Sequence, residues 1–317
     1  MPSKDYVYKT SGSLEIAATV YYRQDETRSS KKPIAIGFHA GGFTIGSRFL
    51  FNSNEIDALL DLGFVVVSAD HRLCPHVSLY EGPIQDAKDA FNWAKTTLPD
   101  LIKKDADIDA DGDQIVAFGQ SSGGTLALHL IPLQGSLPTP PRAIAAFYAA
   151  AYFSDEVWTH PTPGTDMMPP IDEAFADSVY DEAPASMTIV APQQFIAPGT
   201  MPMPNLSVPR DAWMALAFKE GQHLSRCVKD GDFGRVDPAT YFSPKFPPTV
   251  FLTGTEDTFI NPKFSRQAHA QLSDLKVETK LVLAEGGQHG YNFGMEKDDV
   301  RFKETVFPGY EFLADHV

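Results

Sequence analysis

The stretch Gln114-Ile-Val-Ala-Phe-Gly-Gln-Ser-Ser-Gly-Gly-Thr125 decides the fold of this chain. Its apolar, β-branched part, 115–118, is typical of a buried strand. A G-x-S-x-G pattern centred on Ser121 follows directly, and the residues after it are typical of a buried helix. Strand, glycine-flanked serine and helix form the context of a nucleophile elbow, a tight turn that exposes a serine hydroxyl. The same letters also occur in ordinary Gly/Ser-rich turns, so the interpretation depends on partners for Ser121 elsewhere.

Short apolar strands alternate with helical patterns on both sides of this stretch. The pattern predicts an α/β fold with a mostly parallel central sheet flanked by helices. A hairpin over 6–22 precedes it. The further strands are expected at 33–38, 64–69, 143–147, 249–253 and 277–283, and the helices at 54–62, 86–97, 262–272 and 296–306.

One long region, 149–248, interrupts this alternation. It contains 14 of the 25 prolines and six of the eight methionines. A long insertion within a compact fold is usually functional, and methionine adapts its shape to an apolar pocket. We therefore expect an inserted lid, or cap, at 149–248 on a core formed by 1–148 and 249–317. An irregular surface decoration is the alternative. Helices are expected within it at 171–180 and 210–222.

A serine nucleophile needs a base within hydrogen-bond reach, and the base needs an orienting carboxylate. His289 lies in a glycine-rich loop after the last expected strand. Asp257 follows the strand at 249–253, at the same edge of the sheet. Serine, acid and histidine follow one another in the order expected for a chain with a nucleophile elbow. We therefore predict a triad of Ser121, Asp257 and His289, with Glu256 as the alternative acid.

Acyl transfer also requires hydrogen-bond donors where the oxyanion develops. The backbone N–H of Ser122, directly after the nucleophile, is one expected donor. The loop His39-Ala-Gly-Gly42 follows a buried strand and is expected to supply the others, because glycine lets the backbone turn its N–H groups toward a substrate. A plain glycine turn is the alternative.

Five blocks, taken in order, resemble the hormone-sensitive-lipase-like branch of the α/β-hydrolase fold. They are His39-Ala-Gly-Gly-Phe43 with Gly46-Ser47, Asp70-His-Arg-Leu-Cys-Pro75, 109–124, Gly254-x-x-Asp257 and His289-Gly-Tyr291. The resemblance implies that Gly41, Gly42 and Ser122 form the oxyanion hole. The blocks depart from the family pattern at several positions: Ala40 replaces a glycine, Gln120 an acidic residue and Ser122 an alanine. The region 149–248, which determines substrate choice, matches nothing usable in the family.

These residues predict a serine hydrolase that cleaves carboxylic esters or lactones with small or medium apolar groups. An amidase, a thioesterase or a hydrolase of natural-product biosynthesis would use the same triad. A ligand-binding protein or a cyclase also stays open, because a fold does not fix a function. Phe43, Trp213 and Tyr291 are the expected pocket walls.

Charge and composition limit the partners. The net charge of −15 disfavours nucleic acid and anionic membranes, which would repel the chain. Two cysteines, Cys74 and Cys227, are too few for a disulfide framework, and neither has a metal-ligand spacing. No signal-peptide pattern and no membrane-spanning run is visible. We therefore expect a cytoplasmic protein with a small-molecule substrate and without a metal or cofactor; the sequence does not indicate its oligomeric state.

Overall fold

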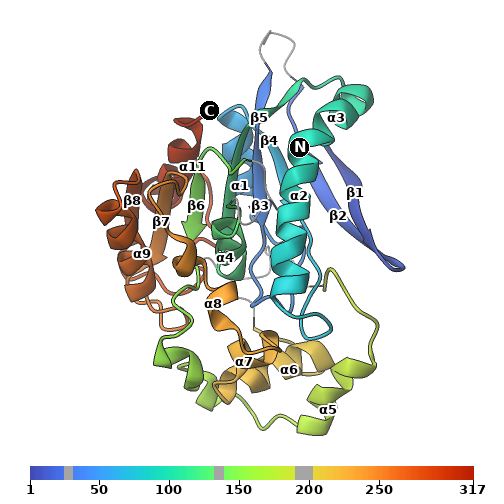
Figure 1. The fold of residues 1–317 in the computed structure, drawn as a ribbon, viewed down its shortest axis with the longest axis vertical. Coiled ribbons are helices and arrows are strands. Elements are labelled where there is room, and N and C mark those ends of the chain that lie inside the picture. Colours follow the sequence, from blue (N-terminus) through green and yellow to red (C-terminus); the bar gives the residue numbers. More distant parts are fainter. Residues whose placement is uncertain (25–30, 132–138, 190–202) are drawn as a thin grey trace.

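An eight-stranded sheet forms the centre of the molecule. The computed structural model describes residues 1–24, 31–131, 139–189 and 203–317 (Figure 1). The strands are β1 (Ser3–Ser11), β2 (Leu14–Tyr21), β3 (Lys32–Phe38), β4 (Val65–Ala69), β5 (Ala110–Gln120), β6 (Ile144–Phe147), β7 (Thr249–Gly254) and β8 (Thr279–Ala284). Their order across the sheet is β1-β2-β4-β3-β5-β6-β7-β8.

Six of these strands run parallel. The β1–β2 hairpin is antiparallel within itself and against β4, whereas every pair from β4 to β8 is parallel. All residues of β4, β6 and β7 are buried, as continuous apolar runs predict for strands covered on both faces. The predicted α/β-hydrolase fold with a mostly parallel sheet is confirmed.

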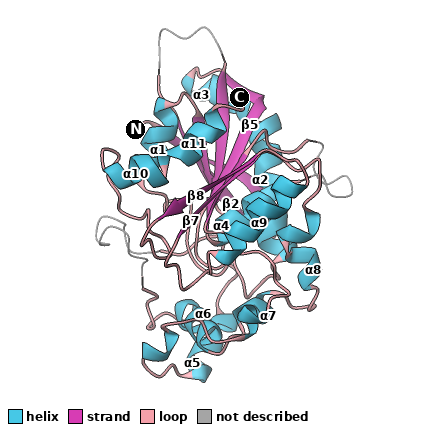
Figure 2. Ribbon diagram, turned by 90° about the vertical axis from the view of Figure 1, so that its left-hand side faces the viewer, coloured by secondary structure: helices cyan, strands magenta, loops and turns pink. Residues whose placement is uncertain are grey.

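Helices cover both faces of the sheet (Figure 2). On one face α2, α4 and α9 contribute to a large apolar core, and on the other α1, α10 and α11 contribute to a second one. The helices are α1 (Ser53–Asp61), α2 (Gln85–Thr96), α3 (Leu98–Ala106), α4 (Ser122–Leu128), α5 (Glu173–Asp177), α6 (Pro209–Lys219), α7 (His223–Cys227), α8 (Phe233–Val236), α9 (Lys263–Asp274), α10 (Val300–Thr305) and α11 (Phe307–Ala314).

Two of the helices beside the sheet, α3 and α11, were not expected from the sequence. Both carry a proline in the first turn, where its fixed φ suits a helix and its missing N–H costs nothing. In α11 this proline is followed by Gly309, where a Cβ would lie 3.0 Å from Leu252 of β7. The pair looks like a turn signal in the sequence, but here it starts a helix that packs closely on the sheet.

The described residues between β6 and β7 form only helices and loops. Helices α5, α6 and α7 lie together beyond one end of the sheet (Figures 1 and 2). Helix α6 corresponds to the helix expected at 210–222, and α5 lies within the one expected at 171–180. Residues 190–202 of the expected cap lie outside the described residues. The division into a core and a cap at 149–248 stays a prediction. No helix in the described part of the chain is long and apolar enough to cross a membrane.

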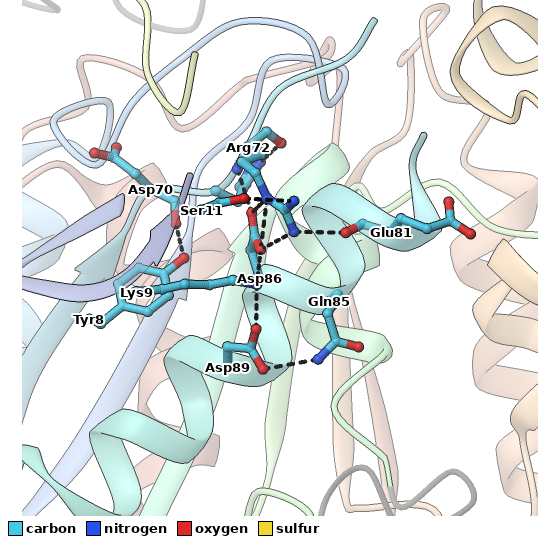
Figure 3. Close-up of polar contacts among 10 residues, drawn as sticks. Tyr8, Lys9, Ser11, Asp70, Arg72, Glu81, Gln85, Asp86 and Asp89 are labelled. Carbon is cyan, nitrogen blue, oxygen red and sulfur yellow. Dashed lines mark hydrogen bonds and ion pairs between the residues drawn. The ribbon is translucent and has the colours of Figure 1, made fainter. Parts of the chain in front are cut away.

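A buried ionic cluster ties the N-terminal hairpin to the core (Figure 3). The fully buried carboxylate of Asp86, on α2, accepts hydrogen bonds from the backbone N–H and the guanidinium of Arg72, at 2.7–2.8 Å. Lys9 of β1 donates to the same carboxylate at 2.6 Å and to Asp89 at 2.5 Å. One helix, one edge strand and the loop after β4 thus meet at a single carboxylate.

Asp70 has a similar role at the start of the loop after β4. Its carboxylate accepts a 2.6 Å hydrogen bond from the backbone N–H of Arg48 and forms an ion pair with the Arg48 guanidinium. Its carbonyl oxygen accepts a hydrogen bond from Tyr8 at 2.7 Å. Burial raises the pKa of Asp70 to about 6, although the hydrogen bonds from Arg48 lower it. The block 70–75 that resembles the family motif therefore holds the scaffold together.

Replacing Asp86 with alanine should destabilise the fold strongly. The change leaves Arg72 and Lys9 without their shared buried partner, and breaking a buried ion pair in this way costs about 3 kcal/mol or more of unfolding free energy. Urea denaturation at pH 7 measures the loss. The control is Asp113→Ala, whose side chain is 89% exposed beside Lys95 and should cost less than about 1 kcal/mol. Equal losses in the two variants would contradict this account.

Candidate active site

Ser121 lies at a strained turn between β5 and α4. Its φ of 53° is rare for a residue with a side chain, and its N–H donates to the carbonyl of Phe147 at 2.9 Å. The turn leaves no room for a side chain at Gly123, where a Cβ would lie 1.9 Å from the carbonyl oxygen of Phe38. The glycine of the G-x-S-x-G pattern is thus a steric requirement, and the serine is held in the conformation that an elbow needs.

The structure brings Ser121, His289 and Asp257 into one hydrogen-bonded chain. The Ser121 hydroxyl lies 2.9 Å from Nε2 of His289, and Nδ1 of His289 lies 2.7 Å from Oδ2 of Asp257. The other oxygen of Asp257 accepts the backbone N–H groups of Phe259 and Ile260, at 2.9 and 2.8 Å. The carboxylate is therefore oriented, and it fixes the imidazole tautomer with its proton on Nδ1. Glu256, the alternative acid, is exposed, and Asp257 takes this place instead.

The loop after β3 borders the nucleophile. The carbonyl of Gly41 accepts the N–H groups of Thr44 and Ile45, both at 3.0 Å, and the carbonyl of Gly42 accepts the Thr44 hydroxyl at 3.0 Å. Gly41 has a φ of 127°, and a Cβ there would lie 2.0 Å from the carbonyl oxygen of Ile45. Among the described residues, the N–H groups of Gly41, Gly42 and Ser122 have no hydrogen-bond acceptor. They are available to a ligand, and their role as oxyanion donors stays a prediction.

Two stacked imidazoles support this loop from behind. The buried His39 donates from Nδ1 to the carbonyl of Ala40 at 2.7 Å, and its ring stacks on His71 with centroids 4.4 Å apart. Burial, with a further contribution from His71, lowers the pKa of His39 well below its usual value, and burial also lowers the pKa of His71. Both rings are neutral at physiological pH, so His39 braces the loop and does not act as the base.

An apolar cavity of about 230 Å³ opens directly beside Ser121 and His289. Its described walls are mostly apolar, and three methionines and three phenylalanines are among them. Among its described lining residues, His289 is the only titratable one. The walls are Ala40, Gly41, Gly42, Ile45, Gly46 and Leu50 from the N-terminal half, Pro163, Gly164, Thr165, Met168, Met203, Pro204, Met214, Ala215 and Phe218 from the expected cap, and Phe259 and Phe293.

A second, more polar cavity of about 100 Å³ lies on the far side of Phe218 and Phe259. These two rings meet edge to face, with centroids 4.8 Å apart, and line both cavities. His223 stacks on Phe218 at 3.9 Å and lies against Gly42, where a Cβ would be 3.2 Å from its Nε2. A third cavity, of about 30 Å³, is lined by Phe43, Ser121 and His223, and also by Phe218 and Phe259.

Of the three expected pocket walls, only Phe43 lines a described cavity next to Ser121. Trp213 is 1% exposed, and its successors on α6, Met214 and Ala215, face the apolar cavity instead. Tyr291 is also 1% exposed, and its hydroxyl donates to the carbonyl of Thr305 at 2.8 Å. Both side chains lie in the protein core and line neither of the two described cavities beside Ser121, so their role as pocket walls stays a prediction.

A family model described as the alpha/beta hydrolase fold matches residues 35–194, which is half of the chain. The chain belongs to the α/β-hydrolase fold family. The matched region begins in β3 and includes the loop after β3 and the Ser121 turn. This match confirms the family that the five sequence blocks resemble.

The chain is similar over almost its whole length to a portion of several fungal proteins. It is 32% identical to the non-reducing polyketide synthase adrD of Penicillium rubens over 340 residues, with 98% of this chain and 13% of that protein covered. It is 31% identical to the non-reducing polyketide synthase ausA of Emericella nidulans, with 98% and 14% covered. The chain thus spans about one seventh of the length of these relatives.

Solved structures of similar shape include esterase 2 of Thermogutta terrifontis. The form phosphorylated by paraoxon has a TM-score of 0.63 at 18% identity and covers 99% of this chain and 94% of that one. The butyrate-bound form has a TM-score of 0.62 at 20% identity, with the same coverage. At such identities the similarity shows the fold, and the site of this α/β-hydrolase must be argued from its own residues.

In this α/β-hydrolase, the loop after β4 docks the helices that cover the cavity. Arg210 of α6, only 2% exposed, donates to the carbonyl of Cys74 at 2.5 Å and to Nδ1 of His76 at 2.9 Å. The backbone N–H of Leu79 donates to the carbonyl of Cys227, at the end of α7, at 2.9 Å. Because α6 carries Met214 and Ala215, these bonds set the position of the cavity wall.

Replacing Arg210 with alanine should loosen this docking. The change leaves the carbonyl of Cys74 and a nitrogen of His76 without a charged donor, and each such bond contributes about 1.5–3 kcal/mol. We expect a loss of about 3 kcal/mol in urea denaturation and faster hydrogen exchange in α6 than in β5 or β7. Arg226→Ala is the control, because Arg226 and Glu220 form a partly exposed surface pair. If α6 exchanges no faster in Arg210→Ala than in Arg226→Ala, Arg210 is not the anchor.

Proposed function

We propose that this α/β-hydrolase is a serine hydrolase that cleaves carboxylic esters or lactones of small to medium apolar substrates. The observation that carries the proposal is the chain of hydrogen bonds from Ser121 through His289 to Asp257, at 2.9 and 2.7 Å, beside an apolar cavity. A serine activated in this way is the nucleophile of acyl transfer. The strained backbone of Ser121 and the free N–H groups next to it also support a hydrolase over a ligand-binding protein or a cyclase.

The reaction follows from the positions of these groups. Nε2 of His289 accepts the Ser121 proton while Oγ attacks the carbonyl carbon, and Asp257 stabilises the imidazolium that results. The N–H groups of Gly41, Gly42 and Ser122 donate to the oxyanion, and one such donor contributes about 3 kcal/mol of transition-state stabilisation. His289 then protonates the leaving group. A water, deprotonated by the same nitrogen, hydrolyses the acyl-enzyme.

The cavities support an apolar acyl group and a more polar leaving group. The larger cavity has no Asp, Glu, Lys or Arg side chain along its described walls, so an apolar chain is favoured there over a sugar or peptide. The second cavity includes Thr162, His223 and Asn261. These side chains offer hydrogen bonds to a leaving group on the other side of Phe218 and Phe259.

Turnover of p-nitrophenyl esters of increasing chain length tests the proposal. We expect activity that peaks at a short or medium acyl chain and falls by about a thousandfold or more in Ser121→Ala. His289→Ala should lose as much, and Asp257→Asn somewhat less, because the carboxylate acts only through the imidazole. Ser265→Ala, a change at an equally buried serine on α9, is the matched control.

The outcome separates the hydrolase from its alternatives. Full activity in Ser121→Ala would exclude the mechanism. A wild-type protein that turns over no ester, and whose serine no fluorophosphonate labels, would instead favour a ligand-binding protein or a cyclase.

The relatives favour a second candidate, the cleavage of an acyl thioester. They are polyketide synthases that match 98% of this chain. Building a polyketide requires activated acyl groups, and a thioester is one, which the same serine attacks by the same steps. A thioesterase of this kind would place the polyketide-type acyl group in the apolar cavity.

Paired substrates distinguish the two candidates. An N-acetylcysteamine thioester and an ethyl ester of the same aromatic or aliphatic acid differ only in the leaving group. If the chain is a thioesterase, kcat/KM for the thioester should exceed that for the ester by more than the ratio of their rates with hydroxide. A ratio equal to that with hydroxide, or lower, would leave the carboxylic esterase as the better description.

A further inference from the structure

A buried glutamate lies directly behind the proposed active site. Glu55 is in the first turn of α1 and is fully buried. One oxygen of its carboxyl accepts a 2.7 Å hydrogen bond from the side-chain amide of Gln120, and the other accepts a 2.5 Å hydrogen bond from that of Asn292. Both amides are themselves buried. A single carboxyl therefore joins two side chains that are 172 positions apart in the sequence.

These two side chains belong to the two segments that carry the proposed nucleophile and the proposed base. We call these segments, the end of β5 and the loop that contains His289, the two arms of the site. Gln120 is the last residue of β5 and directly precedes Ser121, and Asn292 lies in the same loop as His289. The amide oxygen of Asn292 accepts the hydroxyl of Tyr148 at 2.7 Å, and the Tyr148 ring packs edge-on against His289 with centroids 4.7 Å apart. A displacement of the Glu55 carboxyl would therefore displace both Ser121 and His289.

Other residues at the start of α1 also contact the loop that contains His289. The side-chain amides of Asn52 and Asn54 donate to the carbonyl of Met295 at 2.8 and 3.1 Å. Lys297 pairs with Asp57 at 2.8 Å. Of these residues at the start of α1, Glu55 also contacts β5. It therefore connects the loop that contains His289 to the strand that precedes Ser121.

The surroundings of Glu55 indicate that packing alone does not explain the carboxyl. No cation of the described chain pairs with it, and the titratable groups around it are the phenols of Tyr310 on α11, Tyr148 and Tyr291. Burial raises the pKa of Glu55 to about 7, although the hydrogen bonds from Asn292 and Gln120 lower it. Burying an unpaired carboxyl is unfavourable, and an apolar side chain would fill the same space without this cost.

We propose that Glu55 is a positioning residue, whose two hydrogen bonds to Gln120 and Asn292 set the distance between Ser121 and His289. Glu55 touches neither the substrate nor the reacting atoms, and this inference rests on the proposed serine hydrolase function. Errors of about 1 Å in the position of catalytic groups can lower rates by about a hundredfold. A carboxyl that accepts from both arms reduces such errors without taking part in proton transfer.

The test is the kinetics of Glu55→Ala with the best p-nitrophenyl ester. We expect kcat to fall by about 10- to 100-fold while KM changes by less than about threefold, because the cavity beside Ser121 does not include Glu55. The rate of fluorophosphonate labelling should fall by the same factor as kcat. Ile56→Ala, a change at the next residue of α1, also buried, is the control. It should lower the melting temperature and leave kcat within about twofold.

An exchange variant keeps the proposal testable if Glu55→Ala fails to fold. Gln120→Glu alone sets a second carboxylate against that of Glu55, and neither can donate a hydrogen bond to the other. Combining it with Glu55→Gln restores a donor and an acceptor at both contacts, so kcat should recover toward the wild-type value. Two results overturn the inference: equal kcat in Glu55→Ala and Ile56→Ala, or no recovery in the double variant. Neither result touches the proposed function, which fails if turnover does not depend on Ser121 or if the wild-type protein turns over no ester.

Discussion

Between β5 and α4 the chain reverses through a turn that has no room for a side chain at Gly123 and holds Ser121 at a positive φ. The rest of the site is arranged around this turn. Because β5, β7 and β8 are parallel, the loops that follow β7 and β8 meet the turn at one edge of the sheet. The backbone N–H of Glu256 donates to the carbonyl of Gly287 at 3.0 Å. This bond joins the loop of Asp257 to that of His289, so three side chains distant in sequence form one chain of hydrogen bonds.

Buried polar groups hold the elements around this turn in place. The Asp86 and Asp70 carboxylates fix the hairpin and the loop after β4, and Arg210 fixes α6 on that same loop. Glu55 joins α1 to the two arms of the site. Each of these groups is charged or polar in an apolar setting, where an unpaired group is costly and a paired one allows few alternative arrangements. The apolar cavity is thus bounded by elements whose positions are set by hydrogen bonds.

The sequence was sufficient to predict those features that depend on a single strand and the loop after it. The sheet, the hairpin, Ser121, Asp257 and His289 were all found from strand patterns and the loops after them, and the structure places the three side chains in contact. The oxyanion donors and the roles of the triad stay predictions.

The cavity walls depend on how helices are rotated, and the sequence of α6 does not show this. Its residues 212–217 are all buried, so no polar face distinguishes Trp213 from Met214. Glu55 was missed for a related reason: a glutamate in a first turn is a common helix-starting residue, and only the docking of α1 shows that it points inward.

The most direct test of the central claim is intact-protein mass spectrometry after treatment with a fluorophosphonate. The account predicts one adduct per chain, located at Ser121 by peptide mapping, with a labelling rate that falls at least about a hundredfold in His289→Ala. An apolar ester that the enzyme turns over should slow the labelling by competition. An adduct at another residue, or an equal rate in His289→Ala, would contradict the claim that the hydrogen bond from Ser121 to His289 activates the serine.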